Sequence, residues 1–251
     1  MDTASLIDAT ATPIHELGGA FYYAPSTAAM GEALGLDVFL FYGLGRGGVL
    51  GDVDADAVVD AFRWFKPSVV RAQWEEGRAI ASPVKAASAY VEAARTYARN
   101  TFHETAVLRS FCDAAVEAVD AASTGTWPLV DGYRAFELPE DCVERAYQLV
   151  VVLREMRGAA HGDAVEALGM TPTEAHFLTG GDAFELYGYD AEDVPEVTDE
   201  MIERRALAED RTTELLVPSY EVLDDQARLA FLEGVRELAA TADIEVEDVA
   251  D

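Results

Sequence analysis

The sequence predicts an all-α fold made of two helical halves. Apolar residues recur at spacings of three and four along most of the chain, which is the period of an amphipathic helix, and no long stretch shows the alternation of a strand. Glycine, proline and helix-capping residues divide this pattern into segments. With 251 residues, 50% of them apolar, the chain can form a large core without disulfides or a structural metal.

The first elements are predicted from their cap residues. A helix over residues 12–19 would have Thr12 as its cap and Pro13 at its first position, and would end at two glycines. Ser26 would cap a second helix, over residues 26–42. Residues 43–52 contain five glycines and are predicted to form a loop.

The rest of the first half is predicted to be helical as well. Asp54 begins a helix that ends before Pro67, and Ser82 caps the longest helical stretch, which has a candidate break near Asn100. Residues 123–139 combine Gly, Pro and aromatic residues without a helical period. We therefore place the boundary between the halves there, which gives an N-terminal half over 1–125 and a C-terminal half over 126–251.

The second half is predicted to hold five helices. The first runs to about Arg157 and the second covers residues 159–168. A third begins at Thr171, which forms a capping box with Glu174. Helices near 199–215 and 220–240 complete the core.

A short sequence occurs in similar form in both halves. Residues 32–36 and 166–170 match at four of five positions, and each contains Ala-Leu-Gly before a predicted turn and a second helix. A helix, a tight turn with glycine and a second short helix make up a helix-turn-helix. We therefore expect helix-turn-helix-like units, one of them near 159–180, and consider an internal duplication, although Ala-Leu-Gly is common at helix ends.

The charge balance predicts an acidic surface suited to concentrated salt. The net charge is −29, from 47 acidic and 18 basic residues, of which two are lysine. Salt screens the repulsion that such a surface generates. The composition resembles that of haloarchaeal proteins, and the alternative is an acidic protein of a mesophile.

The chain lacks a secretory signal pattern and any apolar run of membrane-spanning length, so a cytoplasmic protein without a membrane partner is expected. Its two cysteines, Cys112 and Cys142, indicate neither a disulfide framework nor a metal site.

Four segments of the chain resemble a known family. They are HELGGAFYYAP (15–25), GLGRGGVLGDV (43–53), FRWFKP (62–67) and REMRGAAHGDAVEALGMTPTEA (154–175). Together they look like a SalK-like, helix-turn-helix family of actinobacteria and haloarchaea, over most of the first 190 residues. Lys66 and Val49 depart from the family pattern, which has Asn and Pro there. The resemblance implies an all-helical fold with helix-turn-helix-like units, and it does not indicate a substrate.

The favoured function is binding of a small molecule or a protein partner in a cleft between the halves. Candidate binding residues are Arg46, Trp74, Tyr22 and Tyr42. Aromatic residues at helical spacing are also common in cores, which is the alternative explanation. The glycine-rich stretch around Arg46 could hold a phosphate, but it lacks the Walker spacing. A turn in which Arg46 pairs with Asp52 or with the carboxyl end of a helix is the simpler interpretation.

Two other functions are considered. A DNA-binding regulator would use residues 171–178 as its recognition helix, but these include no Arg or Lys, so nucleic acid is disfavoured as a partner. An enzyme would use His161 or His15 as acid/base and Arg157 as the anchor for an anion, because Arg157 and His161 lie one helical turn apart. Each histidine could instead be structural. No cofactor is identified, and whether the protein is an enzyme stays open. The deciding observation is whether His15 and His161 meet at one cavity.

Overall fold

The computed structural model describes residues 1–178, 187–190 and 192–244, and within them the fold is all-α, as predicted. These residues form twelve α-helices and two short 3₁₀-helices, with no β-strand. The α-helices are α1 (Thr3–Gly19), α2 (Pro25–Ala33), α3 (Val38–Gly47), α4 (Ala55–Ala61), α5 (Pro67–Ile80), α6 (Pro83–Thr101), α7 (Ala106–Ala121), α8 (Pro128–Arg134), α9 (Cys142–Ala167), α10 (Pro172–Phe177), α11 (Asp199–Tyr220) and α12 (Asp225–Thr241). The 3₁₀-helices are η1 (Ala20–Tyr23) and η2 (Gly48–Leu50).

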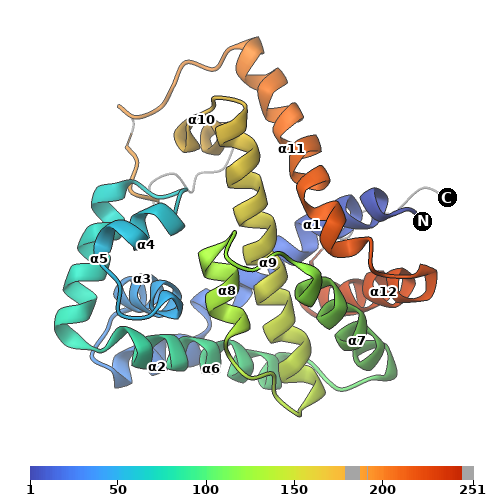
Figure 1. The fold of residues 1–251 in the computed structure, drawn as a ribbon. Coiled ribbons are helices and arrows are strands. Elements are labelled where there is room, and N and C mark those ends of the chain that lie inside the picture. The colour runs from blue at the N-terminus through green and yellow to red at the C-terminus, as the bar shows by residue number, and fades with distance from the viewer. Residues whose placement is uncertain (179–186, 191, 245–251) are drawn as a thin grey trace.

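Helix α9 runs through the middle of the molecule (Figure 1). It packs against α1, α6, α7 and α11, and α12 packs in turn against α7 and α1. The segment Gln148 to Leu153 is buried at every position, as expected of a helix enclosed on all sides. The main core extends from Leu6 to Ala239, so segments on both sides of residue 125 pack around it.

Residues 43–52 are mainly helical, so the predicted loop is wrong. Helix α3 continues to Gly47 and η2 follows it; in this stretch only Gly51 has a positive φ, at 89°. The glycines serve close packing instead. A Cβ at Gly45 would lie 2.7 Å from the Tyr90 side chain, and one at Gly48 would lie 2.3 Å from the Pro83 carbonyl oxygen. Because glycine has no side chain, Gly45 and Gly48 allow α3 and η2 to approach α6. The number of glycines in the sequence could not show whether they serve close packing or a turn.

Helix α9 is continuous through residue 158, so the predicted division near Arg157 is wrong. Asp141 caps the helix by accepting hydrogen bonds from the backbone N–H groups of Val143 and Glu144, each at 3.0 Å. Gly158 in a helix interior costs about 1 kcal/mol relative to Ala. No atom lies within 4 Å of a Cβ placed at Gly158, because this face of α9 borders the cavity described below.

Three further predictions differ from the structure, and the first is that helix α8 lies within residues 123–139, where no helical period was predicted. Helix α1 begins at Thr3 instead of residue 12, because Asp2 caps it and Pro13 is accommodated inside it. The predicted helix over 26–42 is divided at Gly35, and Asp37 caps the second part. The ends at Gly19 and Thr101, the start at Pro83 and the capping box of Thr171 confirm the corresponding predictions.

The two repeated segments end their helices in the same way. Gly35 and Gly169 have φ of 79° and 67°. The next backbone N–H reaches back to the helix in both, from Leu36 to the Gly31 oxygen at 2.9 Å and from Met170 to the Val165 oxygen at 3.1 Å. These are the bonds of a Schellman motif. The shared turn covers only these few residues, and a duplication of the halves is not shown by it.

No single helix among the described residues has the length and apolar composition of a membrane span. Helices α2 and α3 pass this test only as a pair, and they meet at a bend of 80°.

Candidate functional site

A cavity of about 830 Å³ opens beside α9 and is the candidate site. Its wall takes residues from α1, α3, α4, α9, α10 and α11 and from the segments before α5 and α8. Five arginines line it: Arg46, Arg63, Arg154, Arg157 and Arg205. Among the residues that the structure describes, three carboxylates accompany them: Asp60, Glu155 and Glu209. In this described part of the lining, arginines outnumber acids, in a chain whose net charge is −29.

The cavity brings together most of the residues that the sequence singles out. His15, Tyr42, Arg46, Arg157 and His161 all line it, and they come from both predicted halves. The two histidines therefore meet at one cavity.

The other two candidates lie outside the lining. The Tyr22 ring packs edge-on against Tyr42, with centroids 5.2 Å apart, behind the cavity wall. Trp74 is 1% exposed in the core, where its Nε1 donates to the Val53 carbonyl oxygen at 3.3 Å. The roles of all these residues stay predictions.

Arg46 and Glu155 form a buried ion pair at the inner wall. Arg46 donates from Nε to Oε1 of Glu155 at 2.9 Å and from Nη2 to Oε2 at 2.7 Å. The side chains are 8% and 3% exposed. Burial alone would lower the pKa of Arg46 and raise the pKa of Glu155, but the partner charge reverses both shifts. Arg46 therefore has a partner other than Asp52, which binds Arg78.

A second arginine shares the same glutamate. The Arg154 guanidinium lies 3.5 Å from Glu155 Oε1, donates from Nε to the His15 carbonyl oxygen at 3.2 Å and lies over the Tyr22 ring at 5.2 Å. The carboxylate of Glu155 thus serves two guanidinium groups.

The same arrangement occurs at the α11 end of the cavity. Arg157 donates to Glu209 Oε2 at 2.8 Å, and Arg205, four residues before Glu209 on α11, binds the other oxygen. Burial lowers the pKa of both arginines, and the charge of Arg157 lowers the pKa of Arg205 further. Two cations here share one carboxylate.

His161 is fixed between these groups. Its ring stacks on Trp64, with centroids 5.3 Å apart and planes at 22°. Its Nδ1 lies 2.8 Å from Thr212 Oγ1, and that hydroxyl also lies 2.6 Å from the Ala208 carbonyl oxygen. Because the single hydroxyl proton is needed for the carbonyl, Nδ1 carries the proton of the neutral imidazole and Nε2 keeps its lone pair.

His15 and His161 are both neutral at pH 7. Burial, followed by the charges of Arg205 and Arg157, lowers the pKa of His161 to about 3. His15 is open to the water of the cavity but has protein on most sides, and this partial desolvation with the charges of Arg154 and Arg157 lowers its pKa to about 4. A neutral imidazole can accept a proton or a hydrogen bond from a ligand.

A third ion pair at the wall is balanced one to one. Arg63 binds Asp163, and the other oxygen of Asp163 accepts a hydrogen bond from Trp127 Nε1 at 2.9 Å. The indole of Trp127 lines the cavity and so does the ring of Trp64. The wall therefore offers flat apolar surfaces beside the cationic groups.

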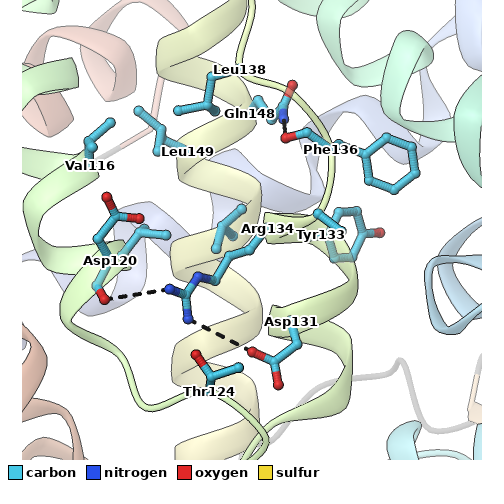
Figure 2. A pocket seen from close by; sticks show the side chains of 13 residues that line it. Val116, Asp120, Thr124, Asp131, Tyr133, Arg134, Phe136, Leu138, Gln148 and Leu149 are labelled. Atoms are coloured by element: carbon cyan, nitrogen blue, oxygen red, sulfur yellow. Dashed lines mark hydrogen bonds and ion pairs between the residues drawn. The ribbon is translucent and has the colours of Figure 1, made fainter.

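A smaller cavity of about 340 Å³ lies between α7, α8 and α9 (Figure 2). Its polar groups bind the chain itself. Arg134 donates to the carbonyl oxygens of Ala122 at 3.0 Å and Asp120 at 3.5 Å, and the Gln148 amide donates to that of Phe136 at 3.4 Å. Because these groups are already satisfied, the larger cavity is the better candidate site.

The described residues contain no cluster of three His, Cys, Asp or Glu side chains that could hold a metal ion. Cys112 and Cys142 are free thiols. Burial raises the pKa of Cys112 to about 12, so this thiol is unreactive at neutral pH.

Sequence reasoning missed three important residues of the site: Glu155, Arg205 and Glu209. Glu155 could have been found from the sequence, because it lies two residues after Leu153, at the end of a buried apolar run, and is separated from it only by Arg154. A charge near such a run must be buried with a partner or turn toward a cavity. Arg205 and Glu209 could not, because their spacing is that of an ordinary surface ion pair on a helix.

A family model described as a helix-turn-helix family matches residues 7–194. This matched segment contains both helix-turn-helix-like turns and the inner wall of the cavity. The chain belongs to this helix-turn-helix family. The match covers nearly the same part of the chain as the resemblance seen in the sequence, while the narrower SalK-like relation stays a prediction. Helices α11 and α12 follow the matched segment.

No curated protein and no solved structure matches the chain. The clearest helix-turn-helix-like unit in the described residues consists of α9, the turn at Gly169 and α10. Helix α10 also reaches the cavity, because Ala175 and His176 line it.

Proposed function

We propose that the protein binds a small organic anion with a flat apolar part in the cavity beside α9. One observation carries the proposal: four arginines of the wall share two carboxylates, those of Glu155 and Glu209. Arginine forms strong, directional hydrogen bonds to carboxylate and phosphate groups. An anion would be attracted by the four arginines that share these two carboxylates.

The aromatic wall supports the apolar part of such a ligand. Trp64 and Trp127 line the cavity, and the ring of Trp64 is already held in a stack by His161. Ligand sites are commonly apolar pockets with a few polar groups that fix orientation. A neutral His161 could accept a hydrogen bond from the ligand, or act as a base if the ligand is a substrate.

The test uses phenyl phosphate, a doubly charged probe with one aromatic ring, and benzyl alcohol as its neutral analogue. Calorimetry at pH 8 and constant potassium chloride should show phenyl phosphate binding with a heat that benzyl alcohol lacks. Arg157→Met should weaken binding of the phosphate by about 1.5–3 kcal/mol, as for a lost hydrogen bond to a charged group. Arg99→Met is the matched control, because Arg99 binds Glu92 and Glu144 away from the cavity.

Two results would overturn this function. One is equal affinity for phenyl phosphate and benzyl alcohol. The other is the absence of phenyl phosphate binding by protein whose circular dichroism shows the helical fold.

The family membership favours DNA binding as a second candidate function. The turn at Gly169 joins α9 to α10 in helix-turn-helix order. Charge weighs against it: residues 171–178 contain no Arg or Lys, and the Glu174 carboxylate is engaged by the Thr171 N–H at 2.7 Å. Thr173, Glu174 and His176, which a recognition helix would expose, are half-buried.

Fluorescence anisotropy with a labelled random-sequence duplex tests this candidate. DNA binding would appear as a rise in anisotropy that falls steeply as salt increases. No rise at low salt, from folded protein, would exclude it.

A further inference from the structure

Glu209 differs from Glu155 in how it is held. Its side chain is 39% exposed, whereas that of Glu155 is 3% exposed. Each oxygen of Glu209 accepts from a different arginine, Arg157 or Arg205, so neither guanidinium is bound in the bidentate way of Arg46. A guanidinium has five N–H groups, and most of those at this end stay available.

Arg205 has a buried donor without a partner. Its Nε is inaccessible to solvent and makes no hydrogen bond with the described residues. An unsatisfied buried donor costs free energy comparable to a lost hydrogen bond, so native proteins rarely keep one. The donor belongs to a side chain that lines the cavity, and a ligand atom could satisfy it once Glu209 or the Arg205 side chain has moved to uncover it.

The charges at this end also bear on the kind of ligand. Arg157 and Arg205 carry two positive charges and both bind Glu209, Asp8 also acts electrostatically on Arg157, and His161, 3.9 Å from Glu209, is neutral at pH 7. A doubly charged group in the place of Glu209 would match the two arginines more closely than a single carboxylate does. A phosphate monoester carries close to two charges at neutral pH and has three acceptor oxygens.

We propose that Glu209 occupies the place of the ligand's phosphate group and that the ligand displaces it. This inference rests on the proposed function and assigns the anionic group of the ligand to the α9–α11 end of the cavity. Displacement needs only a rotation of the half-exposed Glu209 side chain toward solvent. The phosphate would then accept hydrogen bonds from Arg157 and from Nε of Arg205. Helix α11, which follows the segment matched by the family, therefore supplies the specificity residues Arg205 and Glu209.

The test is the affinity of Glu209→Gln for phenyl phosphate. Displacement predicts that this variant binds the probe about fivefold more tightly than the wild-type protein, because a weak competing ion pair is removed. A carboxylate that only orients the arginines predicts weaker binding instead. Glu214→Gln is the matched control: it makes the same charge change on α11, where Glu214 binds Arg211 at the surface. Its affinity should stay within about twofold of wild type.

Arg205→Met complements this measurement. It should weaken phenyl phosphate binding about thirtyfold, through the loss of charged hydrogen bonds. Binding by the wild-type protein together with unchanged or weaker binding by Glu209→Gln would overturn the displacement and leave the anion site standing. No binding by any folded variant would overturn the anion site and the displacement with it.

Discussion

Glu155 and Glu209 each hold two arginines of one cavity, but in different surroundings. Glu155 is 3% exposed and makes a bidentate bond to Arg46, whose guanidinium lies over the Phe62 ring at 4.4 Å. Glu209 is 39% exposed and bonds each arginine through one oxygen. The same residue types can thus build a fixed wall at one end and an exchangeable contact at the other, and burial decides between them.

The largest expected effect is on stability, at the buried end. Glu155→Gln leaves Arg46 buried without its counter-charge, which should lower the free energy of unfolding by about 3–5 kcal/mol. Urea unfolding at constant potassium chloride, followed by circular dichroism, measures it. The double variant Arg46→Met, Glu155→Leu should recover part of the loss, because it removes the buried charge of Arg46, although Arg154 still loses its contact with Glu155. A loss below about 1 kcal/mol would show that the ion pair of Glu155 contributes no more to the free energy of unfolding than that of Glu209.

A smaller effect should come from acid, through His161. Its pKa is about 3 in the folded protein, against about 6.5 in the unfolded chain, so the unfolded chain binds the extra proton between these values. Stability should therefore fall as pH falls below about 6.5, and His161 should account for about 2 kcal/mol between pH 7 and pH 5.

The comparison with His161→Gln isolates this contribution, because protonation of the many carboxylates affects both proteins alike. The variant should lose less stability than wild type over the same pH range. Parallel curves would mean that His161 is protonated in the folded protein near pH 6, and the positive surroundings inferred for the α11 end would be wrong.

The residues of the cavity show what sequence could and could not predict. The pair Arg157 and His161 was predictable, because a spacing of four on a helix places two side chains on one face. The partner of Arg46 was not: Glu155 lies 109 residues away, and only the packing of α3 against α6, and of α6 against α9, brings the two together.

The glycines of residues 43–52 teach the same lesson at the level of fold. Glycine favours a turn where φ is positive, as at Gly51, but Gly45 and Gly48 let two helices touch. Both demands select the same residue, and the tertiary contact that distinguishes them is absent from the local sequence. Caps depend on neighbouring residues alone, which is why the capping box of Thr171 was predictable.

The smallest expected effect is on stability at the exchangeable end. Glu209→Gln should change the free energy of unfolding by less than about 1 kcal/mol, because a half-exposed ion pair contributes little and Gln can still accept a hydrogen bond from Arg157 or Arg205. Urea unfolding beside Glu155→Gln under the same salt gives the comparison directly. If the two variants lose equal stability, both arginine pairs are structural, and Glu209 could not leave its place for a ligand. A small loss at Glu209 with a large loss at Glu155 is what a wall with one fixed and one exchangeable end requires.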